Sequence, residues 1–262
     1  MKIPTDTLHQ LADELLQAKV ARKPIDPLSE RFPTLTEDEA YRIQEINANF
    51  STKQGAKHIG YKIGLTSREA QKQFNISKPD FGHLFSDMSV LEERPVIRDS
   101  LIQPKIEGEL AFILGRDLKG PGVTIIDVLS AVDAVVVCME IVDSRVRDWK
   151  IRATDTIADN GSSALFVVSG VKYSIRGMSL AGLGMSLSQN GEVIATGAGS
   201  AVMGNPLSAV VFVANELGGR GKTLKEGQII LSGSLTAMLK VSKNDFFTCE
   251  VGGLSRLSLR FQ

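Results

Sequence analysis

The sequence predicts an α+β fold, in which an N-terminal helical subdomain precedes a β-rich domain, and two observations carry this prediction. Near the N-terminus, apolar residues recur at spacings of three and four, which is the period of a helix with one buried face. From about Ile59 onwards, glycines and β-branched residues become frequent, and turn residues separate short apolar runs, as expected for strands. Because helices and strands do not alternate regularly, the pattern argues against a Rossmann sheet and a (β/α)8 barrel.

Two helices are expected in the N-terminal part. The second begins after Thr36, because Thr36 and Glu39 have the spacing of a capping box, and we expect it to reach about Phe50. We place a boundary near residues 53–58, which divides the chain into a helical subdomain of residues 1–57 and a β-rich domain of residues 58–262. The apolar stripe of the first helix would consist of Leu8, Leu11, Leu15 and Ala18.

Short apolar runs in the remainder of the chain predict strands. Asn190-Gly191, between two such runs, predicts a two-residue hairpin turn that leads into Glu192–Thr196. A short helix is expected over Thr124–Val132, and a longer one should open at Asn205-Pro206 and close at Gly218-Gly219. The candidate strands are Ile59–Ile63, Leu110–Leu114, Ala134–Ile141, Ala164–Ser169, Gly184–Gln189, Gln228–Ser232 and Leu257–Phe261.

Composition and charge exclude several classes of protein. Lys and Arg number 30, as do Asp and Glu, and this balance argues against a protein that binds nucleic acid, which needs a surplus of cations. The sequence contains no run of about 18 apolar residues, so we expect no membrane-spanning segment. The start of the chain lacks the apolar segment of a secretory signal, so we expect a cytoplasmic protein. With three His and two Cys, any metal ion would be held mainly by carboxylates.

Three glutamates form the most informative pattern. Glu107 and Glu109 are two positions apart, so on a strand they would share one face, and the flanking residues are apolar. Glu140 closes another long apolar run, where a carboxylate is costly to bury without a partner. Converging carboxylates would suit a hard divalent cation such as Mg²⁺ or Mn²⁺. The alternative is that they are strand-edge glutamates, paired with Lys105, Arg145 or Arg147.

Four further polar residues are candidates for a substrate site. Lys62, between strand-like residues and two glycines, is either an inward cation for a substrate carboxylate or a solvated strand lysine. Asp80 follows Lys78-Pro79 and is either functional or a residue that stabilises a turn. Ser162 and Ser234 lie in Gly- and Ser-containing stretches that would either close a small anion pocket or form ordinary loops.

The order of several motifs along the chain resembles a known enzyme family. The similarity is to the 2-hydroxypenta-2,4-dienoate (2-oxopent-4-enoate) hydratases, which are grouped with the 4-oxalocrotonate decarboxylases in the fumarylacetoacetate-hydrolase-like superfamily. It covers nearly the whole chain and implies a mixed β-roll body with an N-terminal helical part. The motifs are Lys-Ile-Gly-Leu-Thr-Ser (62–67), Pro-Asp-Phe-Gly (79–82), Pro-Lys-Ile-Glu-Gly-Glu (104–109), Glu-Ile-Val-Asp-Ser-Arg (140–145), Asp-Thr-Ile-Ala-Asp-Asn (155–160) and Ser-Gly-Ser-Leu-Thr (232–236).

This resemblance implies a lyase of aromatic meta-cleavage catabolism, a homo-oligomer built on pentamers, that adds water to a 2-hydroxydienoate to give 4-hydroxy-2-oxopentanoate or a homologue. Mg²⁺ or Mn²⁺ would be held by the three carboxylates identified above, Glu107, Glu109 and Glu140. Lys62 would balance negative charge on the substrate and assist proton transfer, while Ser162 and Ser234 would donate hydrogen bonds to it. Asp80 would orient or deprotonate the water.

Three alternatives remain beside the hydratase. A 4-oxalocrotonate (2-oxohex-3-enedioate) decarboxylase is the first, although the resemblance implies that decarboxylases lack a carboxylate at the position of Asp80. The second is hydrolysis of an acylpyruvate, which needs a His–Glu pair; His83 is the one histidine near a candidate motif. The third is a non-catalytic subunit that partners such an enzyme. If the protein is itself the hydratase, it could also form a complex with a pathway decarboxylase.

Overall fold

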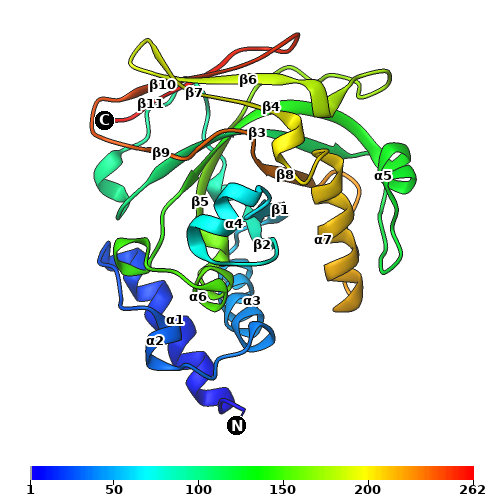
Figure 1. Ribbon diagram of the computed structural model, residues 1–262. Coiled ribbons are helices and arrows are strands. Elements are labelled where there is room, and N and C mark those ends of the chain that lie inside the picture. The colour runs from blue at the N-terminus through cyan, green and yellow to red at the C-terminus, as the bar shows by residue number, and fades with distance from the viewer. Residues whose placement is uncertain (1) are drawn as a thin grey trace.

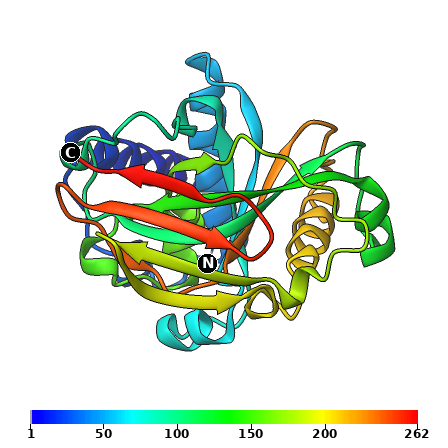
Figure 2. The same cartoon turned by 90° about the horizontal axis from the view of Figure 1, so that it is seen from above.

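The computed structural model describes residues 2–262, apart from the side chain of Gln73. Figure 1 shows the N-terminal helices gathered at one end of the molecule, with the strands forming the body above them and one long helix, α7, along its side. Seen from above in Figure 2, a smaller sheet lies across a larger, curled one. The α+β class and the helical N-terminus are therefore as predicted, and no helix among the described residues has the length and apolar character to cross a membrane.

The N-terminal part consists of α1 (Thr5–Ala21), the short α2 (Leu28–Arg31) and α3 (Glu37–Lys53). The capping box is confirmed, because the Glu39 N–H donates to Thr36 Oγ1 while the Glu39 carboxylate accepts from the Thr36 N–H. The helix predicted to begin after Thr36 is α3, and it extends to Lys53 rather than ending near Phe50. All four residues of the predicted stripe on α1 are buried. The division of the chain at residue 57 into two folding units stays a prediction.

The larger sheet has the order β2-β1-β8-β3-β4-β5, with the short β9 paired to the start of β3. All its neighbouring strands are antiparallel except β1 and β8, which run parallel. Its strands are β1 (His58–Gly64), β2 (Asp80–Phe85), β3 (Lys105–Leu114), β4 (Val132–Val142), β5 (Ser163–Val168), β8 (Ile229–Ser234) and β9 (Leu239–Lys240).

The smaller sheet has the order β11-β10-β6-β7 and is antiparallel throughout. The hairpin at Asn190-Gly191 is confirmed, since it joins the paired strands β6 and β7. Apolar residues of this sheet, such as Leu187 and Phe247, share one core with Phe112 and Val137 of the larger sheet. Its strands are β6 (Gly184–Gln189), β7 (Glu192–Ala198), β10 (Phe246–Val251) and β11 (Leu257–Arg260).

The remaining helices are α4 (Arg68–Phe74), α5 (Ile125–Ala131), α6 (Ala153–Ala158) and α7 (Leu207–Gly219). The helices expected after Thr124 and after Asn205 are confirmed, and Asn205 Oδ1 accepts from the Leu207 N–H. Each predicted strand is present, whereas α2, α4, α6, β2, β9 and β10 were not predicted. Short 3₁₀ helices lie at Ser86–Met88, Arg98–Ser100, Arg147–Trp149, Asn160–Ser162, Leu180–Gly182 and Gly199–Ala201.

One face of the larger sheet carries both apolar residues and carboxylates. Side chains alternate along a strand, so Ala111 on β3 shares its face with Glu109, and Cys138 on β4 shares its face with Glu140. Ala111 and Cys138 belong to a small buried apolar cluster that also includes Leu231 of β8. The carboxylates therefore continue an apolar face rather than stand at a solvated edge.

Candidate active site

The three predicted glutamates meet at one point of the β3–β4 ladder. Glu107 of β3 lies directly opposite Glu140 of β4 in the strand register, and Glu109 follows two residues later on the same face. One carboxylate oxygen from each residue lies within 4.8 Å of the other two. Like charges placed directly opposite one another destabilise a sheet. This arrangement is therefore stable only with a cation or protons between the carboxylates.

Burial makes the negative charge of this cluster costly. Glu109 and Glu140 have no exposed surface, while Glu107 is half-buried. Burial, reinforced by the neighbouring carboxylates, raises the pKa of Glu109 well above its ordinary value. Burial also raises the pKa of Glu107, to about 7, and the pKa of Glu140, while Lys62 opposes both shifts. The fold therefore favours binding of a proton or a cation at these three carboxylates.

Two of the carboxylates are oriented by hydrogen bonds that leave one oxygen of each free. Glu140 Oε1 accepts from Ser163 Oγ at 2.7 Å, and Glu109 Oε2 accepts from the Gly233 N–H at 3.0 Å. Glu109 Oε1 and Glu140 Oε2 are buried without a hydrogen-bond partner. Of these two oxygens, Glu140 Oε2 forms an ion pair with the ammonium of Lys62, whereas the described residues supply Glu109 Oε1 with neither a hydrogen bond nor an ion pair. A buried acceptor of this kind is rare and calls for a ligand.

A hard divalent cation fits this donor set. Mg²⁺ and Mn²⁺ prefer carboxylate oxygens, and a cation would satisfy Glu109 Oε1 and offset the repulsion across the strands. The alternative, strand-edge glutamates paired with Lys105, Arg145 or Arg147, is not what the structure shows. Arg145 pairs with Asp159, Arg147 pairs with Asp26, and the ammonium of Lys105 lies 4.2 Å from the ring centre of Trp149.

Lys62 is buried beside this cluster rather than solvated. Its side chain is 3% exposed, its Nζ lies 3.2 Å from Glu140 Oε2 as an ion pair without hydrogen-bond geometry, and it donates to the Gly161 carbonyl at 2.9 Å. The surrounding carboxylates, first Glu140 and then Asp80, raise the pKa of Lys62 against the opposing effect of burial. The lysine therefore keeps its charge inside the site.

Asp80 begins a buried strand, β2, and does not lie in a solvated turn. Its Oδ2 accepts from Thr156 Oγ1 at 2.9 Å, while its Oδ1 is buried without a partner. Burial raises the pKa of Asp80, although Lys62 opposes this shift. A Cβ atom added to Gly161 would lie 3.5 Å from Lys62 Nζ and 3.6 Å from Asp80 Oδ1, so both groups face the same loop. A carboxylate with one free oxygen and a raised pKa is suited to accept a proton.

The close approach of Asp80 to β1 supplies a test. A Cβ on Gly64 would lie 2.3 Å from Asp80 Oδ1, so Gly64→Ala must displace that carboxylate. If Asp80 acts in the reaction, we expect the variant to lose about 10²-fold in turnover, the usual cost of misplacing a reacting group by about 1 Å. Its Mg²⁺ affinity, measured by calorimetry, should not change. Gly170→Ala is the matched control, because a Cβ there meets no atom within 4 Å; equal turnover in the two variants would contradict this role.

A cavity of about 50 Å³ opens beside these groups. Lys62, Asp80, Glu107 and Ser162 all line it, so four of the predicted residues share one space. Ser162 Oγ donates to Asp159 within the protein, at 3.2 Å. Ser234 is placed differently: it lies opposite Glu109 in the β3–β8 register, and its hydroxyl donates to the Thr236 carbonyl. Ser234 is not among the described residues that line the cavity, and its role as a substrate donor stays a prediction.

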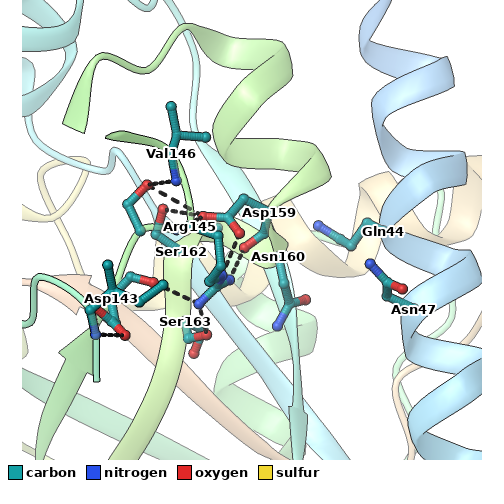
Figure 3. Close-up of polar contacts among 12 residues, drawn as sticks. Gln44, Asn47, Asp143, Arg145, Val146, Asp159, Asn160, Ser162 and Ser163 are labelled. Atoms are coloured by element: carbon teal, nitrogen blue, oxygen red, sulfur yellow. Dashed lines mark hydrogen bonds and ion pairs between the residues drawn. The ribbon is translucent and has the colours of Figure 1, made fainter. Parts of the chain in front are cut away.

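A buried ion pair between Arg145 and Asp159 holds the segment that carries Ser162 and Ser163 (Figure 3). Arg145 pairs with Asp159 and donates to the Ser163 carbonyl, while Asp159 also accepts from Ser162. This loop provides the Gly161 carbonyl that receives Lys62 and the Ser163 hydroxyl that orients Glu140. Arg145 and Asp159 therefore support two of the site groups without lining the cavity.

Sequence reasoning missed several residues of this site. Thr156 of α6 orients Asp80, whereas Trp149, in the 3₁₀ helix Arg147–Trp149, and Met238, in the loop before β9, line the cavity. The Arg145–Asp159 pair joins residues on either side of the segment that contains the 3₁₀ helix Arg147–Trp149 and α6. The signal available in the sequence for Asp159 was its position in the motif 155–160.

The sequence has relatives among known proteins. Residues 54–262 match the fumarylacetoacetate (FAA) hydrolase C-terminal family. A 2-keto-4-pentenoate hydratase from Paraburkholderia xenovorans is 44% identical over 254 residues, which is 97% of this chain and 94% of the relative. A 2-hydroxyhexa-2,4-dienoate hydratase from Comamonas testosteroni is 40% identical, with 94% of each chain covered.

Solved structures show the same fold. A 4-oxalocrotonate decarboxylase from Pseudomonas putida, complexed with magnesium and adipate, superposes with a TM-score of 0.96 at 34% identity, covering 100% of this chain and 99% of that one. A fumarylpyruvate hydrolase from Pseudomonas aeruginosa, in complex with Mn²⁺ and pyruvate, shares the fold at 16% identity, with a TM-score of 0.62 over 78% of this chain and 88% of that one. From the matched residues and from relatives that span nearly its whole length, the protein belongs to the fumarylacetoacetate hydrolase family.

Proposed function

We propose that this protein is a metal-dependent hydratase that adds water to 2-hydroxypenta-2,4-dienoate, or a close homologue, to give 4-hydroxy-2-oxopentanoate. The observation that carries the proposal is the free Oδ1 of Asp80, a candidate base that lines the same cavity as Glu107 of the acidic cluster. The similarity to 2-keto-4-pentenoate hydratases supports it.

In this proposal Glu107, Glu109 and Glu140 hold Mg²⁺ or Mn²⁺. When bound, the metal ion supplies Lewis acidity toward the carboxylate and 2-oxygen of the substrate. Lys62 provides the fixed positive charge beside them, already buried and paired before substrate arrives. Because its ammonium needs no reorganisation, it stabilises negative charge that develops on the substrate oxygens.

The chemistry has two proton-transfer stages. The dienol loses its 2-hydroxyl proton and gains a proton at C5, which gives the conjugated 2-oxo-3-enoate. Water then adds to C4: Asp80 Oδ1 accepts a proton from the water, the hydroxyl binds C4, and C3 takes up a proton as the enolate collapses to the ketone. Thr156 holds the other oxygen of Asp80, which leaves Oδ1 as the proton acceptor.

The test is a spectrophotometric assay of dienol disappearance against a panel of 2-hydroxydienoates, with added Mg²⁺ or Mn²⁺ and with EDTA. We expect turnover that EDTA abolishes and that either metal restores. No loss of the dienol with any substrate, metal present, would contradict the proposed function.

The decarboxylase is the second candidate, because the chain superposes closely on a 4-oxalocrotonate decarboxylase. Release of CO2 from 2-oxohex-3-enedioate, without hydration of the monocarboxylic dienol, would support it. We further propose that the enzyme works in the cytoplasm as a homo-oligomer, built on pentamers, and that it associates with a pathway decarboxylase. Size measurement alone and with that decarboxylase tests the assembly.

Replacing Lys62 by Met should lower kcat/KM by about 10²-fold, the usual cost of removing one electrostatic donor to a developing oxyanion. The methionine side chain has a volume similar to that of the lysine side chain, so the cavity should keep its shape. Steady-state kinetics at saturating Mg²⁺ measure the effect, and Lys57→Met, at an exposed position, is the control. Wild-type kinetics in Lys62→Met would remove Lys62 from the mechanism.

A further inference from the structure

Residues 156–163 form one segment that contacts three side chains of the site. The segment contains the end of α6, the 3₁₀ helix Asn160–Ser162 and the first residue of β5. Its contacts are those of Thr156 with Asp80, of the Gly161 carbonyl with Lys62, and of Ser163 with Glu140. Because a lysine side chain is a long flexible stem, its partners decide where the ammonium lies. The position of this segment relative to β2 therefore affects the distance from the Lys62 ammonium to Asp80.

Asn160 attaches the segment to the outer edge of β2. The His83 N–H donates to Asn160 Oδ1 at 2.7 Å, and Asn160 Nδ2 donates to the His83 carbonyl at 2.9 Å. Because β2 is the end strand of the larger sheet, its outer edge has no strand partner among the described residues, and the carboxamide takes the place of one. His83 and Asp80 lie on this same strand.

The main chain of Asn160 also packs on the face of β2 that carries Asp80. Side chains at i and i+2 share one face of a strand, so Gly82 lies on the same face as Asp80. A Cβ on Gly82 would lie 2.3 Å from the Asn160 carbonyl oxygen, so the glycine is what allows the segment to approach β2 this closely. Asn160 therefore meets β2 twice, with its carboxamide at the edge and with its carbonyl on the face.

The backbone that follows directs the Gly161 carbonyl to Lys62 through a left-handed turn. Asn160, Gly161 and Ser162 have φ values of 58°, 61° and 54°. Such values are unfavourable for residues other than glycine, although asparagine tolerates them better than most. A turn of this kind persists when surrounding contacts hold it, and the two hydrogen bonds from Asn160 to His83 are such contacts.

We propose that Asn160 is a positioning residue: by fixing residues 156–163 to β2, it sets where the ammonium of Lys62 lies relative to the carboxylate of Asp80. The inference rests on the proposed function, in which Asp80 accepts a proton from water and Lys62 stabilises charge on the substrate. Asn160 is not among the described residues that line the cavity, so it acts through these two groups.

The first test is Asn160→Gly, because glycine adopts the same left-handed backbone and the change removes the carboxamide. We expect kcat for dienol hydration to fall by about 10²-fold, the usual cost of misplacing a reacting group by about 1 Å. KM should change less than kcat, because the loss is one of transition-state stabilisation. Mg²⁺ affinity, measured by calorimetry, should not change, since the β4–β5 pairing holds Ser163 and Glu140 independently of Asn160.

Asn190→Gly is the matched control. Asn190 is also left-handed, with φ of 55°, and its carboxamide also makes two hydrogen bonds, to Asp245 and to the Phe246 N–H. It lies in the β6–β7 hairpin and is not among the described residues that line the cavity, so its variant should keep the wild-type kcat. A loss of kcat in Asn160→Gly no larger than in this control, a loss confined to KM, or an equal loss of Mg²⁺ affinity would each overturn the proposal.

Asn160→Asp gives a readout that a merely structural role would not produce. An ionised carboxylate accepts from the His83 N–H but cannot donate to the His83 carbonyl, whereas a protonated one does both. Repulsion from that carbonyl oxygen raises the pKa of the new carboxyl group. We therefore expect the ratio of variant to wild-type kcat to rise as the pH falls, and dividing by the wild-type value removes the titration of Asp80. A ratio independent of pH would contradict the proposal, and this ratio decides if Asn160→Gly does not fold.

Hydrogen exchange separates this inference from the proposed function. The His83 N–H should exchange faster in Asn160→Gly than in the wild type whether or not the protein hydrates a dienol, and unchanged exchange would overturn the role of Asn160. A wild type that hydrates no dienol would refute the proposed function. Hydration by the wild type together with an unchanged kcat in Asn160→Gly would instead overturn only the role of Asn160.

Discussion

Glu109→Gln should abolish metal-dependent hydration, with a loss of at least about 10³-fold in turnover, because Lewis acidity contributes several kcal/mol to such reactions. Glu109 is fully buried, and its Oε1 has no partner within the protein. Glutamine has nearly the same shape and its carbonyl can still accept from the Gly233 N–H, so the change removes mainly one negative charge. Calorimetry with Mg²⁺ should show weaker metal binding in parallel with the loss of turnover.

The same variant should be no less stable than the wild type when metal is absent. Burial and the neighbouring carboxylates raise the pKa of Glu109, which means that its charge is unfavourable in the metal-free fold, and glutamine removes that charge. Thermal unfolding in EDTA measures this, with Glu250→Gln on the exposed face of β10 as the matched control. Undiminished metal binding and turnover in Glu109→Gln would contradict the proposed metal site.

Asp80→Asn should reduce hydration by about 10²- to 10⁴-fold, which is the range attributed to a positioned general base. The asparagine carbonyl can still accept from Thr156 Oγ1, so the local structure should persist while the proton acceptor is lost. Mg²⁺ affinity should stay close to that of the wild type, since Asp80 is not part of the carboxylate cluster. Steady-state kinetics and calorimetry on one preparation separate the two effects.

Asp127→Asn is a matched control for this prediction, because Asp127 is an exposed residue of the α5 capping box and is not among the described residues that line the cavity. Full hydration activity in Asp80→Asn would show that another group, or none, activates the water. A parallel loss of metal affinity would show that Asp80 acts through the metal site instead.

The sequence predicted the fold best where local rules and tertiary structure agree. The capping box at Thr36 and the hairpin at Asn190-Gly191 depend on neighbouring residues, and both are present. Strand β2 was missed because every one of its residues is buried, so it shows no alternation, and Pro79-Asp80 has the composition of a turn. Strand β3 begins at Lys105 rather than at Leu110, because its buried glutamates interrupt the apolar run that marks a strand.

That discrepancy in β3 coincides with the site, as expected where function overrides the usual preference for an apolar interior. The spacing of Glu107 and Glu109 was enough to place both on one face, but the register that sets Glu140 opposite Glu107 depends on the β3–β4 pairing. Ser234 is not among the described residues that line the cavity, and its hydroxyl donates to the Thr236 carbonyl, an orientation that no sequence pattern indicates. Trp149 and Met238 reach the cavity through long-range packing alone.

The central claim is that this site adds water to a dienol, and product analysis tests it most directly. Purified protein with Mg²⁺ would be incubated with 2-hydroxypenta-2,4-dienoate in H2¹⁸O, and the products identified by NMR and mass spectrometry. We predict 4-hydroxy-2-oxopentanoate with ¹⁸O in the C4 hydroxyl, no product in EDTA, and no CO2. Loss of the dienol with release of CO2, cleavage of the carbon chain, or a C4 oxygen not drawn from water would contradict it.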